Sequence, residues 1–142
     1  MSRMHDVAQM LVSCWVLSDE EDRSIPTSHG LLDRALYRTM EATAFPDWMR
    51  QELQFTDSRI GLQCVGLPDV LDWAQRSELT SAPNPSYHSL QVQISPRVAR
   101  RLLRDLGVAA EDAASWGKAL REGLERAKDE LMEYNLSATE EG

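Results

Sequence analysis

Four arginines spaced three and four residues apart are the side chains whose type and spacing point most clearly to chemistry. An α-helix turns about once every 3.6 residues, so positions i, i+3, i+4 and i+7 share one face. Guanidinium groups are permanently charged and offer a planar fork of N–H donors that fits carboxylates and phosphates. The pattern predicts either a basic binding face or a solvated face without a partner. Its members, which we call the arginine face, are Arg97, Arg100, Arg101 and Arg104.

A short segment of alternating apolar and polar residues directly precedes the arginine face. Its period of two predicts a half-buried strand with Gln91 and Gln93 on the polar side. Amide side chains on a strand can hydrogen-bond to base edges, so the segment adds a DNA-binding hypothesis. The order strand, helix, helix over residues 90–134 is similar in outline to that of ribbon-helix-helix DNA-binding proteins, which implies a dimer built on a shared strand. The apolar positions of the segment are Leu90, Val92 and Ile94.

No arrangement of residues in the sequence matches a catalytic or metal-binding motif. Phosphate-binding loop, dinucleotide-binding, serine-hydrolase, zinc-protease and CxxC patterns do not occur. His5, His29 and His88 lie far apart, which favours surface or capping roles. The acidic run Asp19–Asp22 lacks the alternate spacing and the glycine of a calcium loop, which favours a solvated loop. We therefore expect no catalytic residue, no metal site and no cofactor, and a function that leans away from catalysis.

Four tryptophans fall in four different predicted helices. Large aromatic rings in such positions are typical of core anchors. The alternative is a small-molecule pocket lined by three of the rings, with His29 or His88 as an acid or base. The pocket hypothesis uses Trp15, Trp48 and Trp73, and the fourth ring is Trp116.

Length and composition indicate one globular domain. The chain has 142 residues, of which 42% are hydrophobic and 27% are charged, close to the averages of globular proteins. No apolar run approaches the ~20 residues of a membrane-spanning helix. Cys14 and Cys64 stand alone in apolar settings, which predicts buried free thiols. These features, together with an N-terminal region that lacks a recognisable secretion signal, predict a cytoplasmic protein without membrane contact.

The charge of the chain is unevenly distributed. A net charge of −8 argues against nonspecific attraction of the whole molecule to nucleic acid or anionic lipid. Eight of the 15 basic residues nevertheless lie in residues 95–142, around the arginine face. A nucleic-acid partner therefore stays possible at that face.

The hydrophobic pattern predicts a mainly α fold of about five helices with a small β element, a single-domain helical bundle at the margin of the α+β class. We expect the domain to span residues 1–135, with an exposed proline-rich loop at 81–89 and a frayed tail at 136–142. Tyr87 in that loop is a candidate partner-binding residue. The expected helices are Met4–Leu17, Thr27 or Ser28 to Ala44, a short helix after Pro46, Pro68–Leu79, Pro96–Leu106 and Glu111–Asn135.

The β element has two alternative pairings. The pattern of residues 60–67 predicts a second, short strand after a turn at Thr56–Ser58. If this segment and residues 90–94 are both strands, the helix between them allows a parallel pair through a right-handed crossover. Otherwise residues 90–94 pair with their copy in a second subunit.

The last predicted helix carries an apolar heptad stripe, with polar i, i+4 pairs such as Arg121 and Glu125 outside it. Glycines within this helix cost up to ~1 kcal/mol relative to alanine, which suggests a closely packed partner helix. We expect a homodimer through this helix, the strand at 90–94, or both. The alternative is that the first two helices cover the stripe within one chain. The expected dimer positions are Leu120, Leu124 and Leu131.

These features favour a small non-enzymatic interaction or regulatory protein that binds another macromolecule, with a protein as the favoured partner. The hypothesis depends on the heptad helix, on the arginine face and on the lack of a catalytic motif. Two alternatives remain. One is a dimeric DNA-binding regulator that uses Gln91, Gln93 and the arginine face, and the other is the tryptophan-lined pocket.

Overall fold

The computed structural model describes residues 3–27, 30–43, 45–58, 61–81 and 89–141. These residues form a mainly helical fold with small antiparallel β elements, which confirms the predicted fold class. The helices are α1 (Met4–Ser18), α2 (Leu31–Ala42), α3 (Asp47–Glu52), α4 (Leu67–Arg76), α5 (Pro96–Asp105) and α6 (Ala110–Glu141). The strands are β1 (Ser24–Pro26), β2 (Phe55–Ser58), β3 (Gly61–Cys64) and β4 (Ser89–Gln91).

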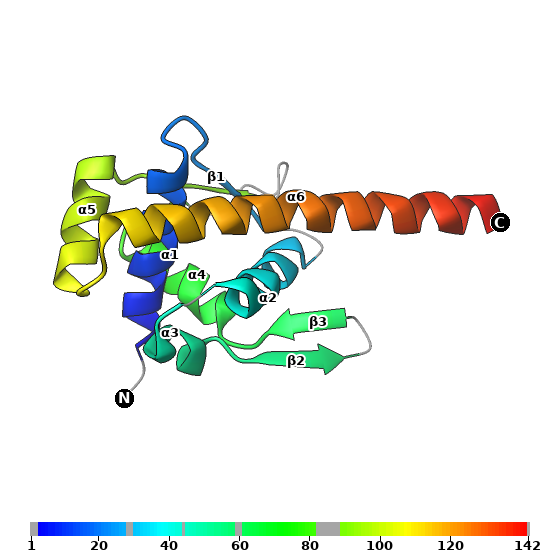
Figure 1. The fold of residues 1–142 in the computed structure, drawn as a ribbon, viewed down its shortest axis with the longest axis horizontal. Helices are drawn as coiled ribbons and strands as arrows, with labels where there is room; N and C mark the ends of the chain where they lie inside the picture. The colour runs from blue at the N-terminus through cyan, green and yellow to red at the C-terminus, as the bar shows by residue number, and fades with distance from the viewer. Residues whose placement is uncertain (1–2, 28–29, 44, 59–60, 82–88, 142) are drawn as a thin grey trace.

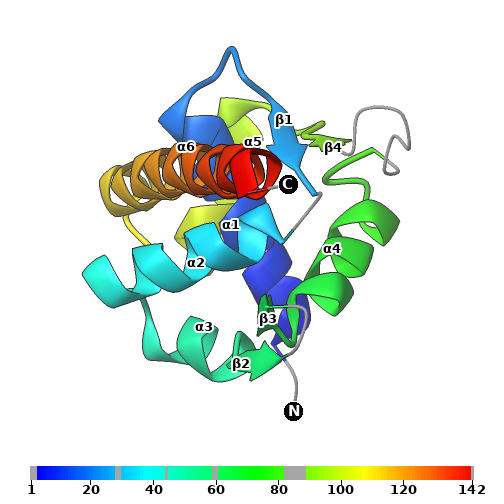
Figure 2. The same cartoon turned by 90° about the vertical axis from the view of Figure 1, so that its right-hand side faces the viewer.

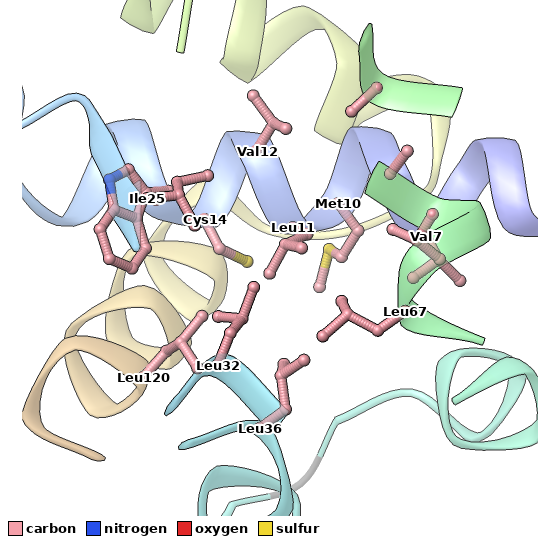
Figure 3. Packing of buried hydrophobic residues seen from close by; sticks show 14 of the residues in the cluster. Val7, Met10, Leu11, Val12, Cys14, Ile25, Leu32, Leu36, Leu67 and Leu120 are labelled. Carbon is pink, nitrogen blue, oxygen red and sulfur yellow. The ribbon is translucent and has the colours of Figure 1, made fainter. Parts of the chain in front are cut away.

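Helix α1 is the centre of the molecule. Its residues from Met10 to Val16 are all buried, so no side of the helix faces water there. Helices α4, α5 and α6 pack against it from different directions (Figure 1 and Figure 2). Figure 3 shows the apolar side chains of α1 facing Leu36 of α2, Leu67 of α4 and Leu120 of α6.

Helix α6 is 32 residues long and packs on both α1 and α2. With a rise of about 1.5 Å per residue it is about 48 Å long, and Figure 1 shows its C-terminal part extending beyond the other elements. Its apolar stripe is buried from Ala113 to Ala127. The helix continues to Glu141, so residues 136–141 are helical, whereas the sequence predicts that the helix ends at Asn135.

Two glycines set how closely α6 approaches its neighbours. A Cβ on Gly117 would lie 2.0 Å from the carbonyl oxygen of Cys14 in α1, closer than any side chain tolerates. A Cβ on Gly123 would lie 3.3 Å from the carbonyl oxygen of Ala35 in α2. The close helix partner that the glycines predict is therefore found within the chain.

Strand β4 lies between two neighbours. It pairs antiparallel with β1 over residues 24–26. On its other side, backbone hydrogen bonds connect Gln91 and Gln93 to residues 79–81. Both predicted pairings of this segment are therefore wrong, because its two edges are occupied by segments that the sequence did not mark as strands. Neither a parallel partner at residues 60–67 nor a second subunit can pair with it.

The strand predicted within residues 60–67 exists as β3, but its partner is β2 in an antiparallel hairpin. β2 contains Thr56, Asp57 and Ser58, all three residues of the predicted turn. Threonine, aspartate and serine favour turns locally, whereas pairing with β3 holds them extended here. β1 has only three residues and ends in a proline, so no alternating pattern marks it in the sequence.

Replacing Gly117 by alanine should destabilise the protein, although alanine normally favours a helix by up to ~1 kcal/mol over glycine. The new methyl group forces α6 away from Cys14 and opens the core, a form of overpacking that costs about 1–3 kcal/mol. Urea unfolding followed by circular dichroism measures the change. Gly123→Ala is the matched control. A Cβ added there has more space, so this change should lower the free energy of unfolding by less. A Gly117→Ala protein as stable as the wild type would contradict the close crossing.

Candidate functional site

Helix α5 is fixed at both ends and along one side. The Ser95 hydroxyl accepts a hydrogen bond from the backbone N–H of Val98 at 3.2 Å, the N-terminal cap that the sequence predicts. Gly107 follows the helix with a φ of +73°, a left-handed conformation that favours glycine. Ala99 and Leu103 are fully buried, and the helix packs on α1. The opposite side of α5 therefore faces outward.

The arginine face occupies this outward side, and all four of its side chains are exposed. Within the described residues, no carboxylate lies within ion-pair distance of any of them. Removing these four positive charges from the total of −8 leaves −12 on the rest of the chain. The arginine face is thus a concentrated positive surface on an otherwise acidic protein.

Several other arginines are engaged in holding the fold together. Arg23 donates a hydrogen bond to the carbonyl oxygen of Ile94 at 2.7 Å. Arg50 donates to the carbonyl oxygens of Met40 and Thr43 at 2.6 and 2.7 Å, where α2 ends. These guanidinium groups satisfy backbone carbonyls that secondary structure leaves open, a role that the exposed arginines of α5 do not share.

Arg121 of α6 is the most extensively bonded example, and it closes the C-terminal end of α1. It donates hydrogen bonds to the Ser18 hydroxyl at 2.6 Å, the Trp15 carbonyl oxygen at 2.7 Å and the Asp22 carboxylate at 3.0 Å. Its guanidinium carbon also lies 4.0 Å from the centroid of the Trp15 ring. Burial lowers the pKa of Arg121, and the carboxylates of Asp22 and Asp19 act in the opposite direction.

Sequence reasoning missed this clamp. The i, i+4 spacing predicts that Arg121 pairs with Glu125 on the outside of α6, but Arg121 reaches across to α1 and the loop after it. The acidic run Asp19–Asp22, predicted to be a solvated loop, supplies one carboxylate and two backbone carbonyl oxygens to it. The sequence carries one signal for this clamp, which is the acidic run directly after a buried helix. A helix C-terminus has open carbonyl groups that attract a cation, and carboxylates beside it attract the same cation.

The two glutamines of the DNA-binding hypothesis precede α5 but are held by the sheet. The Gln91 side chain donates a hydrogen bond to the Ser24 hydroxyl at 2.6 Å, its backbone N–H donates to the Ser81 hydroxyl, and its carbonyl oxygen accepts from the Ser81 backbone N–H. Gln93 is exposed just beyond β4. Because both edges of this segment are occupied, the shared strand of a ribbon-helix-helix dimer cannot form here.

The expected dimer positions on α6 divide into core and edge. Leu120 and Leu124 are only 1% and 2% exposed, on a helix that packs on α1 and α2. Both leucines therefore belong to the core of one chain. This agrees with the alternative to a dimer interface, in which the first two helices cover the apolar stripe of α6. Leu131 is half-buried against the edge of that core. Tyr87 lies outside the described residues, as do His29 and His88.

The tryptophans have separate surroundings. Trp15 is buried, whereas Trp73 on α4 is 42% exposed. Because each ring contacts a different side chain, their arrangement gives the pocket hypothesis no support. The contacts are Arg121 for Trp15, Arg3 for Trp48, His5 for Trp73 and Phe45 for Trp116.

Within the described ranges, no three His, Cys, Asp or Glu side chains are grouped so that they could hold a metal ion. No helix in the same residues combines the length and the apolar composition needed to cross a membrane. In comparisons with known proteins, no protein-family model, no curated protein and no solved structure matches the chain. The candidate site is therefore the arginine face of α5, which is exposed and unpaired among the described residues.

Replacing Arg121 by alanine should lower the free energy of unfolding by about 2–3 kcal/mol, because hydrogen bonds to charged groups contribute about 1.5–3 kcal/mol and the Trp15 ring loses its cover. Arg121→Lys should recover only part of the loss, since an ammonium group lacks the planar fork. Urea unfolding measures both variants. Arg126→Ala, an exposed neighbour on the same helix, should stay within about 0.5 kcal/mol of the wild type. Equal losses at positions 121 and 126 would rule out the clamp.

Both cysteines are free and buried, which confirms the prediction from sequence. Burial raises the pKa of Cys14 and of Cys64 from 9.0 to about 12. Neither thiol should therefore react with dithionitrobenzoate at about pH 8 until the protein unfolds. Because the unfolded chain releases these protons at lower pH than the folded chain, stability should also fall as the pH rises from 9.0 towards about 12. Rapid labelling of the native protein would show that the thiols are accessible.

Proposed function

We propose that this chain is a non-enzymatic interaction protein and that its arginine face docks onto an acidic surface of a partner protein. One observation supports this most directly. Four exposed guanidinium groups lie on a helix whose opposite side is fixed in the core, and no carboxylate of the described residues neutralises them. Charges presented on a rigid helix lose little backbone freedom when a partner binds, which favours docking.

The spacing of the arginine face indicates how the acidic groups of the partner are arranged. Arg97 and Arg104 are two helical turns apart, about 10 Å along the axis. Carboxylates at i, i+3 or i+4, and i+7 on a partner helix cover the same length. Each carboxylate can accept two parallel hydrogen bonds from one guanidinium group. The partner that fits best is an acidic helical segment.

A protein partner is favoured over duplex DNA. DNA presents a continuous row of phosphates, which repels the −12 charge on the rest of the chain. The strand that carries Gln91 is enclosed by neighbours on both edges, so it is not available to a second subunit. An acidic patch on a protein is local, and the arginine face can approach it while the acidic remainder of the chain stays at a distance.

A binding titration with a labelled helical peptide that carries glutamates at i, i+3, i+4 and i+7, read by fluorescence anisotropy, tests the proposal. Binding should weaken as salt rises, because exposed ion pairs are screened. Arg100→Ala combined with Arg101→Ala should weaken it about three- to tenfold, since each exposed pair contributes about 0.2–1 kcal/mol. Lys118→Ala combined with Arg126→Ala removes the same charge from α6 and should change it less than about twofold.

Two results would contradict the proposal. The first is an equal affinity of the two double variants for the peptide, which would mean that the position of the positive charge is irrelevant. The second is tighter binding of a duplex DNA than of the peptide at the same salt concentration, in which case the DNA-binding alternative replaces the proposal. Circular dichroism of each variant checks that the fold is unchanged.

A further inference from the structure

An acidic stripe runs along the outer side of α6. It consists of Glu122, Glu125, Asp129 and Glu133, which are all exposed and follow one another at i, i+3, i+7 and i+11. These intervals place the four carboxylates on one face of the helix, which Arg126 shares because it follows Glu122 at i+4. The stripe lies opposite the side on which Leu124 is buried, so it points away from the core.

Part of the acidic stripe has no cationic partner in the described part of the chain. Lys128 lies 3.5 Å from Glu125. No basic group of the described residues, including Arg126 on the same helix, lies within ion-pair distance of Asp129 or Glu133. Met132, three residues after Asp129 and directly before Glu133, is 63% exposed, so a flexible apolar side chain is accessible on this part of α6.

We infer that the acidic partner of the arginine face is the acidic stripe of a second copy of this chain. The inference rests on the proposed function, because it names the occupant of the same face. The two charged rows are opposite in sign, and part of the stripe has the length of the arginine face. The seven residues from Arg97 to Arg104 equal the interval from Glu122 to Asp129, which contains three of the carboxylates, and Glu133 lies one helical turn further on.

The two charged rows are separated along the length of one molecule. Figure 1 shows α5 beside the first turns of α6 and the C-terminal part of α6 at the far end. The acidic stripe begins twelve residues after Ala110, about 18 Å further along the helix. An arginine face therefore reaches an acidic stripe only in another copy. A two-fold arrangement makes this contact twice and leaves neither charged row open.

Sedimentation equilibrium of the full chain at about 100 µM tests the inference, at about 0.02 M and about 0.5 M salt. At low salt the mass should rise above the 16.1 kDa of one chain towards twice that value, and at high salt it should return to 16.1 kDa. This dependence follows because exposed ion pairs are weak and screened by salt. A mass of 16.1 kDa at low salt would overturn the inference.

Charge reversal then identifies the contact. Arg100→Glu with Arg101→Glu reverses the arginine face, and Asp129→Lys with Glu133→Lys reverses the acidic stripe. Each double variant alone should stay monomeric at low salt, and an equimolar mixture of the two should associate again, because each reversed row then meets an opposite charge. Glu20→Lys with Glu21→Lys, in an exposed loop, changes the net charge as much as the stripe variant and should associate like the wild type.

A mixture of the two folded reversal variants that remains monomeric would overturn the inference. So would association of the wild type that either reversal leaves unchanged. The labelled glutamate peptide separates this failure from failure of the proposed function. If the wild type is monomeric but binds the peptide through its arginine face, only the second copy is excluded as the partner. If it also fails to bind the peptide, the proposed function fails as well.

Discussion

The crossing of α6 over α1 at Gly117 is the constraint on which the remaining packing depends. At this point the backbones of the two helices are so close that even a methyl group would overlap the carbonyl oxygen of Cys14. One helical turn further along α6, Arg121 reaches the end of α1 and covers Trp15. Because α6 covers the middle of α1 in this way, α4 and α5 pack on the remaining sides of α1. The orientation of the arginine face follows, because α5 can bury only its apolar side.

The helices were predictable because their signals are local. The cap at Ser95 and the stop at Gly107 each act within a few residues, and α5 begins and ends close to them. The strand pairs were not predictable. β4 is bonded to residues 24–26, which are distant in sequence, and to residues 79–81, and both segments are too short to show an alternating pattern. The glycines of α6 indicated a close neighbour, but only the path of the whole chain decides whether that neighbour is α1 or a second subunit.

The candidate site shows the same difference between what local sequence signals predict and what tertiary packing decides. Helical periodicity alone placed the four arginines of α5 on one face, and the structure exposes them there. Periodicity also placed Arg121 on an outer face, and it is engaged with α1 instead. The difference is tertiary, because Arg121 follows the close crossing at Gly117 and lies where α1 ends with open carbonyl groups. The spacing of charged residues therefore identifies a face, whereas the packing around it decides whether the charges are available.

The enclosure of α1 also has a consequence for synthesis of the chain. Roughly 100 residues separate α1 from the part of α6 that covers it, and a ribosome adds residues at about 5–20 per second. For several seconds a helix with apolar side chains on every side emerges without its final cover. Exposed apolar surface of this kind associates nonspecifically, and among the helices that precede α6, α4 and α5 are the ones that pack most extensively on α1 before α6 arrives. The contact that encloses the core can thus form only after roughly 100 further residues have been added to the chain.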